Sequence, residues 1–333
     1  MSVATPQPTV AVHRRRLRQV AIPGWRRWVS QAVIVWALVY GSWRIYWALG
    51  AGPSFPPVGT DLVVFTGGWS VVLCGAAAVV VVALRRAAWR RPLALAAWGV
   101  SVALVAASAL LLLDVVGILL PGLGVPFHLV AFVSRVACLA GGVLVGATAL
   151  SYQRHWRGAC LACGRTGEFA RPPRPPRWAW WAAWAAVAGC MLRILAQAAV
   201  GFGTSLLREG GALLMFEAGF LLAGTVLPLA LVYRWGRVFP GWVPLLAGRA
   251  VPRWLVLGPA LGISAGLTAY FGVGTVQLAI ETLNGTWKRN AGGLPLWFFW
   301  VAMPAYLVWG LGLGAAALDY RRSTRPTCRV CGR

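Results

Sequence analysis

The chain has few charged residues and almost no lysine. Only 11% of its 333 residues are charged, with 31 basic residues against seven acidic ones, and lysine occurs once. A water-soluble domain needs more charge on its surface, so this composition excludes an ordinary soluble fold. Hydrophobic residues make up 59% of the chain. The sequence therefore predicts an all-α membrane protein.

The motifs of familiar soluble enzymes are also absent. The sequence contains no phosphate-binding loop, no G-x-S-x-G and no H-E-x-x-H, and it has only three histidines. No pair of carboxylates and no activated nucleophile is found at the same depth within the apolar stretches. An enzyme is therefore the least favoured class of function.

Cysteine is too scarce and too scattered for a disulfide scaffold. Three of the seven cysteines, Cys74, Cys138 and Cys190, lie in apolar runs, where cysteine behaves as a small hydrophobic residue. The other four form two C-x-x-C pairs. The small-residue cleavage site of a secretory signal is missing around the first apolar run, so we expect that run to remain as a spanning helix.

Eight mostly apolar stretches have the length of about 20 residues that crosses a hydrocarbon core. They are approximately 29–49, 62–84, 93–113, 128–150, 179–200, 211–233, 255–276 and 296–318. Pro259 and several glycines weaken the seventh stretch as a helix. Because eight is an even number, both termini are expected on the same side of the membrane.

Basic residues are concentrated in alternate segments between these stretches. If the N-terminus is cytoplasmic, the inner segments hold 25 arginines and the outer loops hold only Arg208, Lys288 and Arg289. Arginine-rich short loops stay in the cytoplasm. The pattern predicts a multi-pass plasma-membrane protein with both termini cytoplasmic. Short basic clusters between apolar runs also argue against a nucleic acid as partner.

One sequence pattern occurs twice. The segments 149–165 and 317–333 share A-L-x-Y-x-R-x-x-R-x-x-C-x-x-C-G-R. Matched G-x-x-x-G pairs precede them, Gly142/Gly146 and Gly310/Gly314. An even number of crossings per copy makes both copies enter the membrane in the same direction. We therefore expect eight transmembrane helices arranged as two tandem parallel four-helix repeats, with the paired glycines packing the fourth helices on each other or on a helix of their own repeat.

This duplication sets the expected organisation of the chain. It comprises a basic cytoplasmic tail (1–28), a first membrane repeat (29–150), a cytoplasmic linker with a C-x-x-C-G-R unit and a proline-rich segment (151–178), a second membrane repeat (179–318) and a cytoplasmic tail with the second C-x-x-C-G-R unit (319–333).

The two cysteine pairs form a candidate metal site. Both pairs are expected in the cytoplasm, where the repeat symmetry can bring Cys160, Cys163, Cys328 and Cys331 together. Two C-x-x-C pairs supply the four thiolates of a structural zinc site, and the following glycine permits a tight turn. The local pattern resembles the knuckles of zinc-ribbon and rubredoxin-like sites. We expect one structural zinc; redox chemistry, a site shared with another subunit, and no metal at all are the alternatives.

Charged residues inside apolar stretches are the second candidate site, because a charge in a membrane is costly and is usually kept for a function. Arg44, Arg193, Arg135 and Glu217 lie in the outer parts of their stretches. Arginine can bind a carboxylate or phosphate through two parallel hydrogen bonds, which predicts an outward-facing ligand site. In the structural alternative these arginines reach the outer interface, or pair with Asp61 and Glu217.

Two segments carry a resemblance to a known group. The runs Tyr40–Gly50 and Gly236–Gly248, with the high content of arginine, alanine and tryptophan, are similar to uncharacterised actinobacterial multi-pass membrane proteins. The resemblance implies a plasma-membrane location and no particular activity.

Two further classes of function remain open. The parallel repeats and outer arginines favour binding or transport of a small anionic molecule or a lipid headgroup through a cavity between the repeats, with the bilayer as the other partner. The cysteine pairs, proline-rich linker and basic tails favour a membrane-anchored interaction or regulatory protein with a cytoplasmic partner. A cavity between the repeats favours the first, and a well-packed interior favours the second.

Overall fold

The computed structural model describes residues 25–55, 60–86, 91–160, 162–166, 175–201, 211–241, 247–287, 294–328 and 331. These residues form helices and no strand. The first half of the chain contains α1 (Trp25–Tyr46), α2 (Gly68–Arg86), α3 (Arg91–Ala107), α4 (Leu111–Leu119) and α5 (Leu129–Trp156). The second half contains α6 (Arg177–Val200), α7 (Gly211–Leu221), α8 (Leu227–Val232), α9 (Arg253–Leu283) and α10 (Leu296–Ser323). Most of the predicted basic tail (1–24) and part of the linker (167–174) lie outside the described residues.

The helices fit the predicted membrane architecture. Seven described helices or helix pairs are long and apolar enough to cross a membrane, and the bent pair α3–α4 would make an eighth. Their outward surfaces are apolar: on α1, for example, Val35, Leu38 and Val39 are 59%, 66% and 66% exposed. Water does not tolerate an apolar surface of this extent, whereas lipid does.

The third predicted stretch differs from the expectation, and the seventh is confirmed as a helix long enough to span a membrane. The stretch 93–113 is interrupted after Ala107, and its two helices meet at 42°. The stretch 255–276, weakened in sequence by Pro259 and glycines, lies within the longest helix, α9, of 31 residues. Proline and glycine are tolerated in membrane-spanning helices because no water competes for the backbone hydrogen bonds and neighbouring groups satisfy those that are lost.

Glycines allow close helix packing within each half. Gly142 of α5 packs on Leu104 and Val105 of α3, and Gly310 of α10 packs on Leu267 and Thr268 of α9. The paired glycines therefore join the fourth predicted helix to a helix of its own half, which is the second of the two expected packings. Such small residues let helix backbones approach each other in a membrane.

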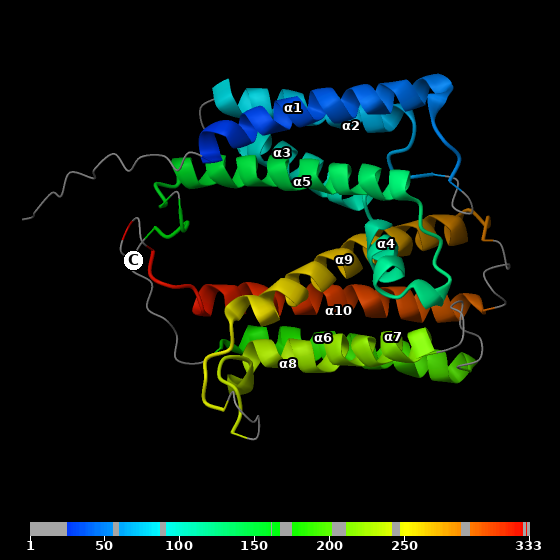
Figure 1. The fold of residues 1–333 in the computed structure, drawn as a ribbon, viewed down its shortest axis with the longest axis vertical. Helices are drawn as coiled ribbons and strands as arrows, with labels where there is room; N and C mark the ends of the chain where they lie inside the picture. Colours follow the sequence, from blue (N-terminus) through cyan, green and yellow to red (C-terminus); the bar gives the residue numbers. More distant parts are fainter. Residues whose placement is uncertain are drawn as a thin grey trace, which may run out of the picture.

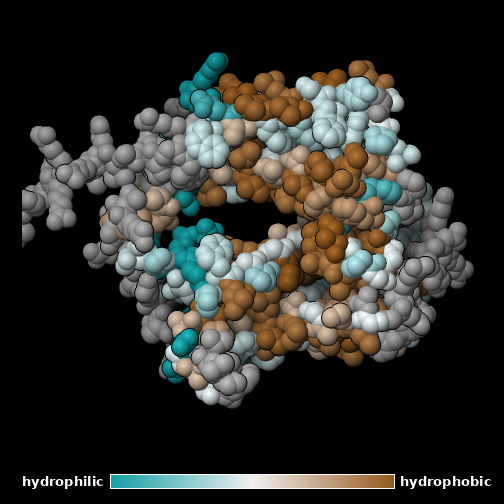
Figure 2. Space-filling model, in the orientation of Figure 1, coloured by the Kyte–Doolittle hydropathy of each residue, from teal (hydrophilic) through white to brown (hydrophobic). Residues whose placement is uncertain are grey.

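The two halves of the chain touch at one end of the helices. Near that end, α3 and α4 contact α9, and the short 3-10 helix η2 (Pro121–Leu123) contacts α7 (Figure 1). Between α5 and the α9–α10 layer, the space-filling view shows an opening bordered largely by hydrophobic residues (Figure 2). At the opposite end, the segments that follow α5 and α10 meet at the cysteines described below.

Candidate functional sites

The four predicted cysteine ligands lie together. The sulfur atoms of Cys160, Cys163, Cys328 and Cys331 all lie within 4.8 Å of one another, and the sulfur atoms of Cys163 and Cys331 are 3.6 Å apart. Four thiolates around a tetrahedral zinc ion at about 2.3 Å are separated by about 3.8 Å. The cluster therefore has the donor set and the spacing to hold such an ion.

Local backbone geometry prepares the first cysteine pair. The N–H of Gly164 donates to the carbonyl of Cys160 (2.6 Å), and the N–H of Cys160 donates to the carbonyl of Arg165 (2.9 Å). Gly164 has φ +77°, a left-handed conformation in which glycine is not strained. This tight turn directs both sulfur atoms of the pair to one point.

The electrostatic surroundings favour ionisation of one thiol of the cluster over that of its neighbour. Burial acts against ionisation of Cys160, but hydrogen bonds from the backbone N–H groups of Cys163 and Ala162 and from neighbouring thiols lower its pKa. Burial, and hydrogen bonds with the thiols of Cys160, Cys331 and Cys328, raise the pKa of Cys163 to about 12. One thiol of the cluster thus ionises first and is stabilised by the others.

Guanidinium groups surround the cysteine cluster. Arg325 donates from Nη1 to the carbonyl of Cys163 (3.0 Å). Burial, together with the positive charges of Arg321, Arg154 and Arg165, lowers the pKa of Arg325. One zinc ion with four thiolates carries a net charge of about −2, which would offset this positive charge.

A second candidate site is a cavity between the two halves. Its volume is about 390 Å³, and its lining includes Val63 and Leu110 from the first half with Tyr270, Phe271 and Met303 from the second. The polar side chains of Thr60, Gln277 and Glu281 also line it. A mostly apolar concave site with a few polar groups is the usual form of a small-molecule site.

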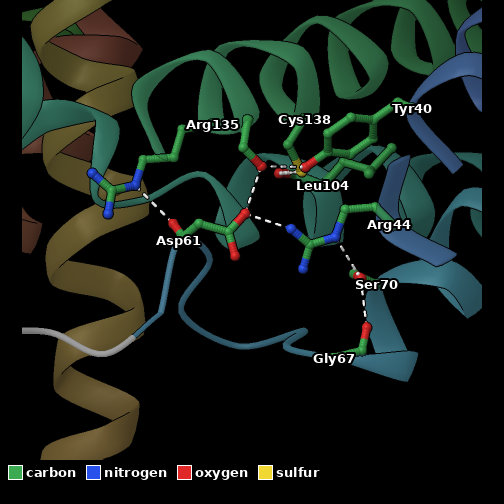
Figure 3. A network of polar contacts seen from close by, with 9 residues as sticks. Tyr40, Arg44, Asp61, Gly67, Ser70, Leu104, Arg135 and Cys138 are labelled. Atoms are coloured by element: carbon green, nitrogen blue, oxygen red, sulfur yellow. Dashed lines mark hydrogen bonds and ion pairs between the residues drawn. The ribbon is translucent and has the colours of Figure 1, made fainter. Parts of the chain in front are cut away.

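Arg44 belongs to a buried polar network rather than to this cavity. Its guanidinium is ion-paired with Asp61, and its Nε donates to Ser70 (2.7 Å) (Figure 3). The Asp61 carboxylate also accepts from Ser134 (2.5 Å), whose hydroxyl contacts that of Tyr40 (2.9 Å). Arg44 and Asp61 are only 3% and 5% exposed. The ion pair that the structural alternative predicts for Arg44 is therefore present.

Arg135 completes the same network. Its Nε donates to the backbone carbonyl of Asp61 (2.7 Å), and its Nη1 donates to both carboxylate oxygens of Asp114 (2.6 and 2.7 Å). The network thus contains two arginines and two aspartates. It joins four parts of the first half, which are α1, α4, α5 and the segment that precedes α2. Its two positive and two negative charges balance.

Arg193 and Glu217 have no such arrangement. No ion pair joins either of them to a described residue. The guanidinium of Arg193 lies over the rings of Phe220 (5.1 Å) and Tyr306 (5.7 Å). The structure therefore brings Arg44 and Arg135 together in one half and leaves Arg193 among aromatic side chains in the other.

Sequence reasoning did not identify the cavity residues. Phe271 and Met303 are apolar residues in apolar helices, so their sequence carries no signal that separates them from core positions. Asp114 is one of only seven acidic residues in the sequence, but the bend between α3 and α4 determines that it pairs with Arg135.

No family model, curated protein or solved structure matches this chain.

Proposed function

We propose that the chain is a multi-pass plasma-membrane protein that binds a small molecule or lipid in the cavity between its halves, and that a zinc ion joins its cytoplasmic ends. The observation that carries the binding proposal is the cavity itself, because residues of both halves line it. A concave site lined by both halves favours ligand binding over a purely interacting module.

The orientation rests on two independent features. The arginine-rich segments alternate along the sequence, with 25 arginines on one side and three basic residues on the other. The meeting of Cys163 and Cys331 requires an even number of crossings between them, which four spans from α6 to α10 satisfy. Both termini are accordingly proposed to be cytoplasmic.

Reporter fusions test this orientation. Green fluorescent protein fused after residue 166 or after residue 333 is expected to fluoresce, because both positions are proposed to be cytoplasmic. Alkaline phosphatase fused after Gly285 is expected to be active, since the α9–α10 loop is proposed to be outside. Positions 166 and 333 on opposite faces of the membrane would contradict both the orientation and the metal site.

An internal duplication is proposed to underlie this architecture. Besides the repeated C-x-x-C-G-R units, one hydrogen bond occurs in both halves: Ser101 donates to the carbonyl of Gly142, and Ser264 donates to the carbonyl of Gly310, each at 2.8 Å. Gly146 and Gly314, one turn later, lie against the same two serines. These equivalent contacts support two parallel four-helix units.

Filling the cavity tests the binding proposal. Gly274 lines the cavity, and a Cβ at this position would lie 3.6 Å from the sulfur of Met303. Gly274→Phe places a ring in the cavity and is expected to weaken binding of a long-chain amphiphile at least about tenfold, since several buried methylenes lose their contacts. Oleyl alcohol, titrated into purified protein in detergent and followed by native mass spectrometry, is a suitable neutral probe.

Gly262→Phe is the matched control. It adds the same side chain to the same helix, where a Cβ meets open space. This variant is expected to bind oleyl alcohol as the wild type does. Equal binding by the wild type and Gly274→Phe would refute the cavity as the ligand site.

A further inference from the structure

Another concave site lies within the first half of the chain, apart from the cavity between the halves. Its volume is about 280 Å³, and residues of α1, α2 and α5 line it. Val29 and Leu84 form an apolar part of its wall, and polar side chains from all three helices complete the lining. None of the described residues that line it is acidic. The function proposed above does not use this site.

The site lies at the ends of candidate membrane spans. The span of α2 ends at Arg86 and that of α5 ends at Trp156, while Ser30 is the third residue of the span that begins at Trp28. In Figure 1 these helix ends lie on the left, on the same side as the C-terminus. A site at this depth faces the lipid headgroups, the layer in which tryptophan is favoured.

Hydrogen-bond donors on three helices line the site. The Nε of Arg85 donates to the hydroxyl of Ser30 (2.8 Å), which holds the exposed guanidinium beside the site. Among the described residues this is the only hydrogen bond of Arg85, and none of them forms an ion pair with it. Its two terminal nitrogens are therefore available as donors. Ser151 and His155 add a hydroxyl and a ring N–H from α5.

The repeated sequence pattern allows a comparison with the second half. It aligns Ser151 with Asp319, so the second copy has a carboxylate where the first has a hydroxyl. The positive charges of Arg237 and Arg322 act on the Asp319 carboxylate, which belongs to a residue only 7% exposed. The second copy thus has its own negative group among these guanidinium groups. In the first copy, none of the described residues that line the site supplies one.

We propose that this site binds a phosphate group through Arg85, Ser30 and Ser151. An external anion would then take the place that the Asp319 carboxylate has in the second copy. Donors from three helices reach a ligand from several sides, which suits the tetrahedral oxygens of phosphate better than a planar carboxylate. Guanidinium groups bind phosphate through strong charge-assisted hydrogen bonds. At this depth a phospholipid headgroup supplies such a group, and a soluble phosphate is the other source.

Native mass spectrometry of the full chain in detergent, titrated with dioleoyl phosphatidylglycerol, tests the site. Arg85→Gln is expected to weaken binding about tenfold, because charge-assisted hydrogen bonds are lost. Ser151→Asp is expected to weaken it to a similar extent, because it places the carboxylate of the second copy beside Arg85. Arg86→Gln is the matched control. It removes the same charge from the next residue of α2, which does not line the site, and should bind as the wild type does.

Two further probes identify the source of the phosphate. Dioleoylglycerol has the same acyl chains and no phosphate, so Arg85→Gln should not change its binding. Inorganic phosphate has no acyl chains. Selective loss of phosphatidylglycerol in Arg85→Gln identifies a lipid headgroup as the ligand, and selective loss of inorganic phosphate identifies a soluble phosphate. Binding of both that is unchanged in Arg85→Gln, or that falls equally in Arg86→Gln, would overturn the proposal.

Thermal unfolding separates binding from folding. Without added lipid, Arg85→Gln should unfold near the wild-type temperature, since the replaced side chain is exposed. The bound probe is expected to raise the unfolding temperature of the wild type and not that of Arg85→Gln. Arg85→Lys keeps the charge without the planar fork and should retain part of the increase.

This site and the cavity can fail independently, because they share no lining residue. In the Gly274→Phe background, the difference between wild-type Arg85 and Arg85→Gln should persist. Its disappearance there would place the bound lipid in the cavity and overturn the phosphate site. Unchanged binding in Arg85→Gln would leave the cavity proposal in place.

Discussion

Replacing Cys163 with serine is expected to lower the zinc content of the purified protein from about one ion per chain to nearly none. The sulfur of Cys163 lies 3.6 Å from that of Cys331 and within 4.8 Å of the other two. A serine hydroxyl is a poor zinc ligand, so one substitution removes a quarter of the ligand set. Structural zinc sites contribute about 10–16 kcal/mol of binding free energy, which makes this the largest effect expected for a single substitution.

The measurement is elemental analysis by mass spectrometry after exhaustive dialysis, together with alkylation of thiols in the folded protein. Cys138→Ser is the matched control, because Cys138 is buried away from the cluster and donates to the carbonyl of Leu104, which a serine can also do. Wild-type protein with well under one zinc ion per chain, and with all four clustered thiols alkylated, would show that no metal is held.

The second large effect is expected at the buried ion-pair network. Asp61→Asn removes the negative charge that faces Arg44 and leaves that guanidinium buried without a counter-ion. Breaking one side of a buried ion pair costs about 3–5 kcal/mol, so the variant should unfold at clearly lower temperature or denaturant concentration than the wild type. Tryptophan fluorescence in detergent during thermal and dodecyl sulfate unfolding reports this change.

Removing both charges is the control for this prediction. Arg44→Gln/Asp61→Asn leaves no unpaired charge and keeps hydrogen-bonding groups on both sides, so it should recover a large part of the lost stability. The Arg135–Asp114 pair is left in place in both variants. A single variant as stable as the wild type would mean that Asp61 does not stabilise Arg44.

The general architecture follows from sequence because it depends on long, simple signals. Apolar stretches of about 20 residues predict the helices, and the repeated C-x-x-C-G-R units predict which cysteines form a cluster. Both signals remain readable where single residues disfavour a helix. The glycines of α9 illustrate this, since the helix runs through them and through Pro259.

The pairing of charges was harder to predict. Arg44 and Arg193 occur in the same local sequence, Arg-Ile, yet one is neutralised by an aspartate and the other is flanked by aromatic rings. The difference arises from residues distant in sequence: Asp61 lies in the segment before α2, while Tyr306 lies in α10. Sequence patterns identify a charge in a helix, but packing decides what compensates it.

The placement of the contacts between the halves has a mechanical consequence. The halves touch through α3, α4 and η2 near one end and meet again at the cysteines near the other, with the opening of Figure 2 in between. The contacts of α3, α4 and η2 thus form a hinge at one end, and the four cysteines hold the halves together at the other. Separation of the two cysteine pairs would let the halves move apart about this hinge and would widen the opening between them.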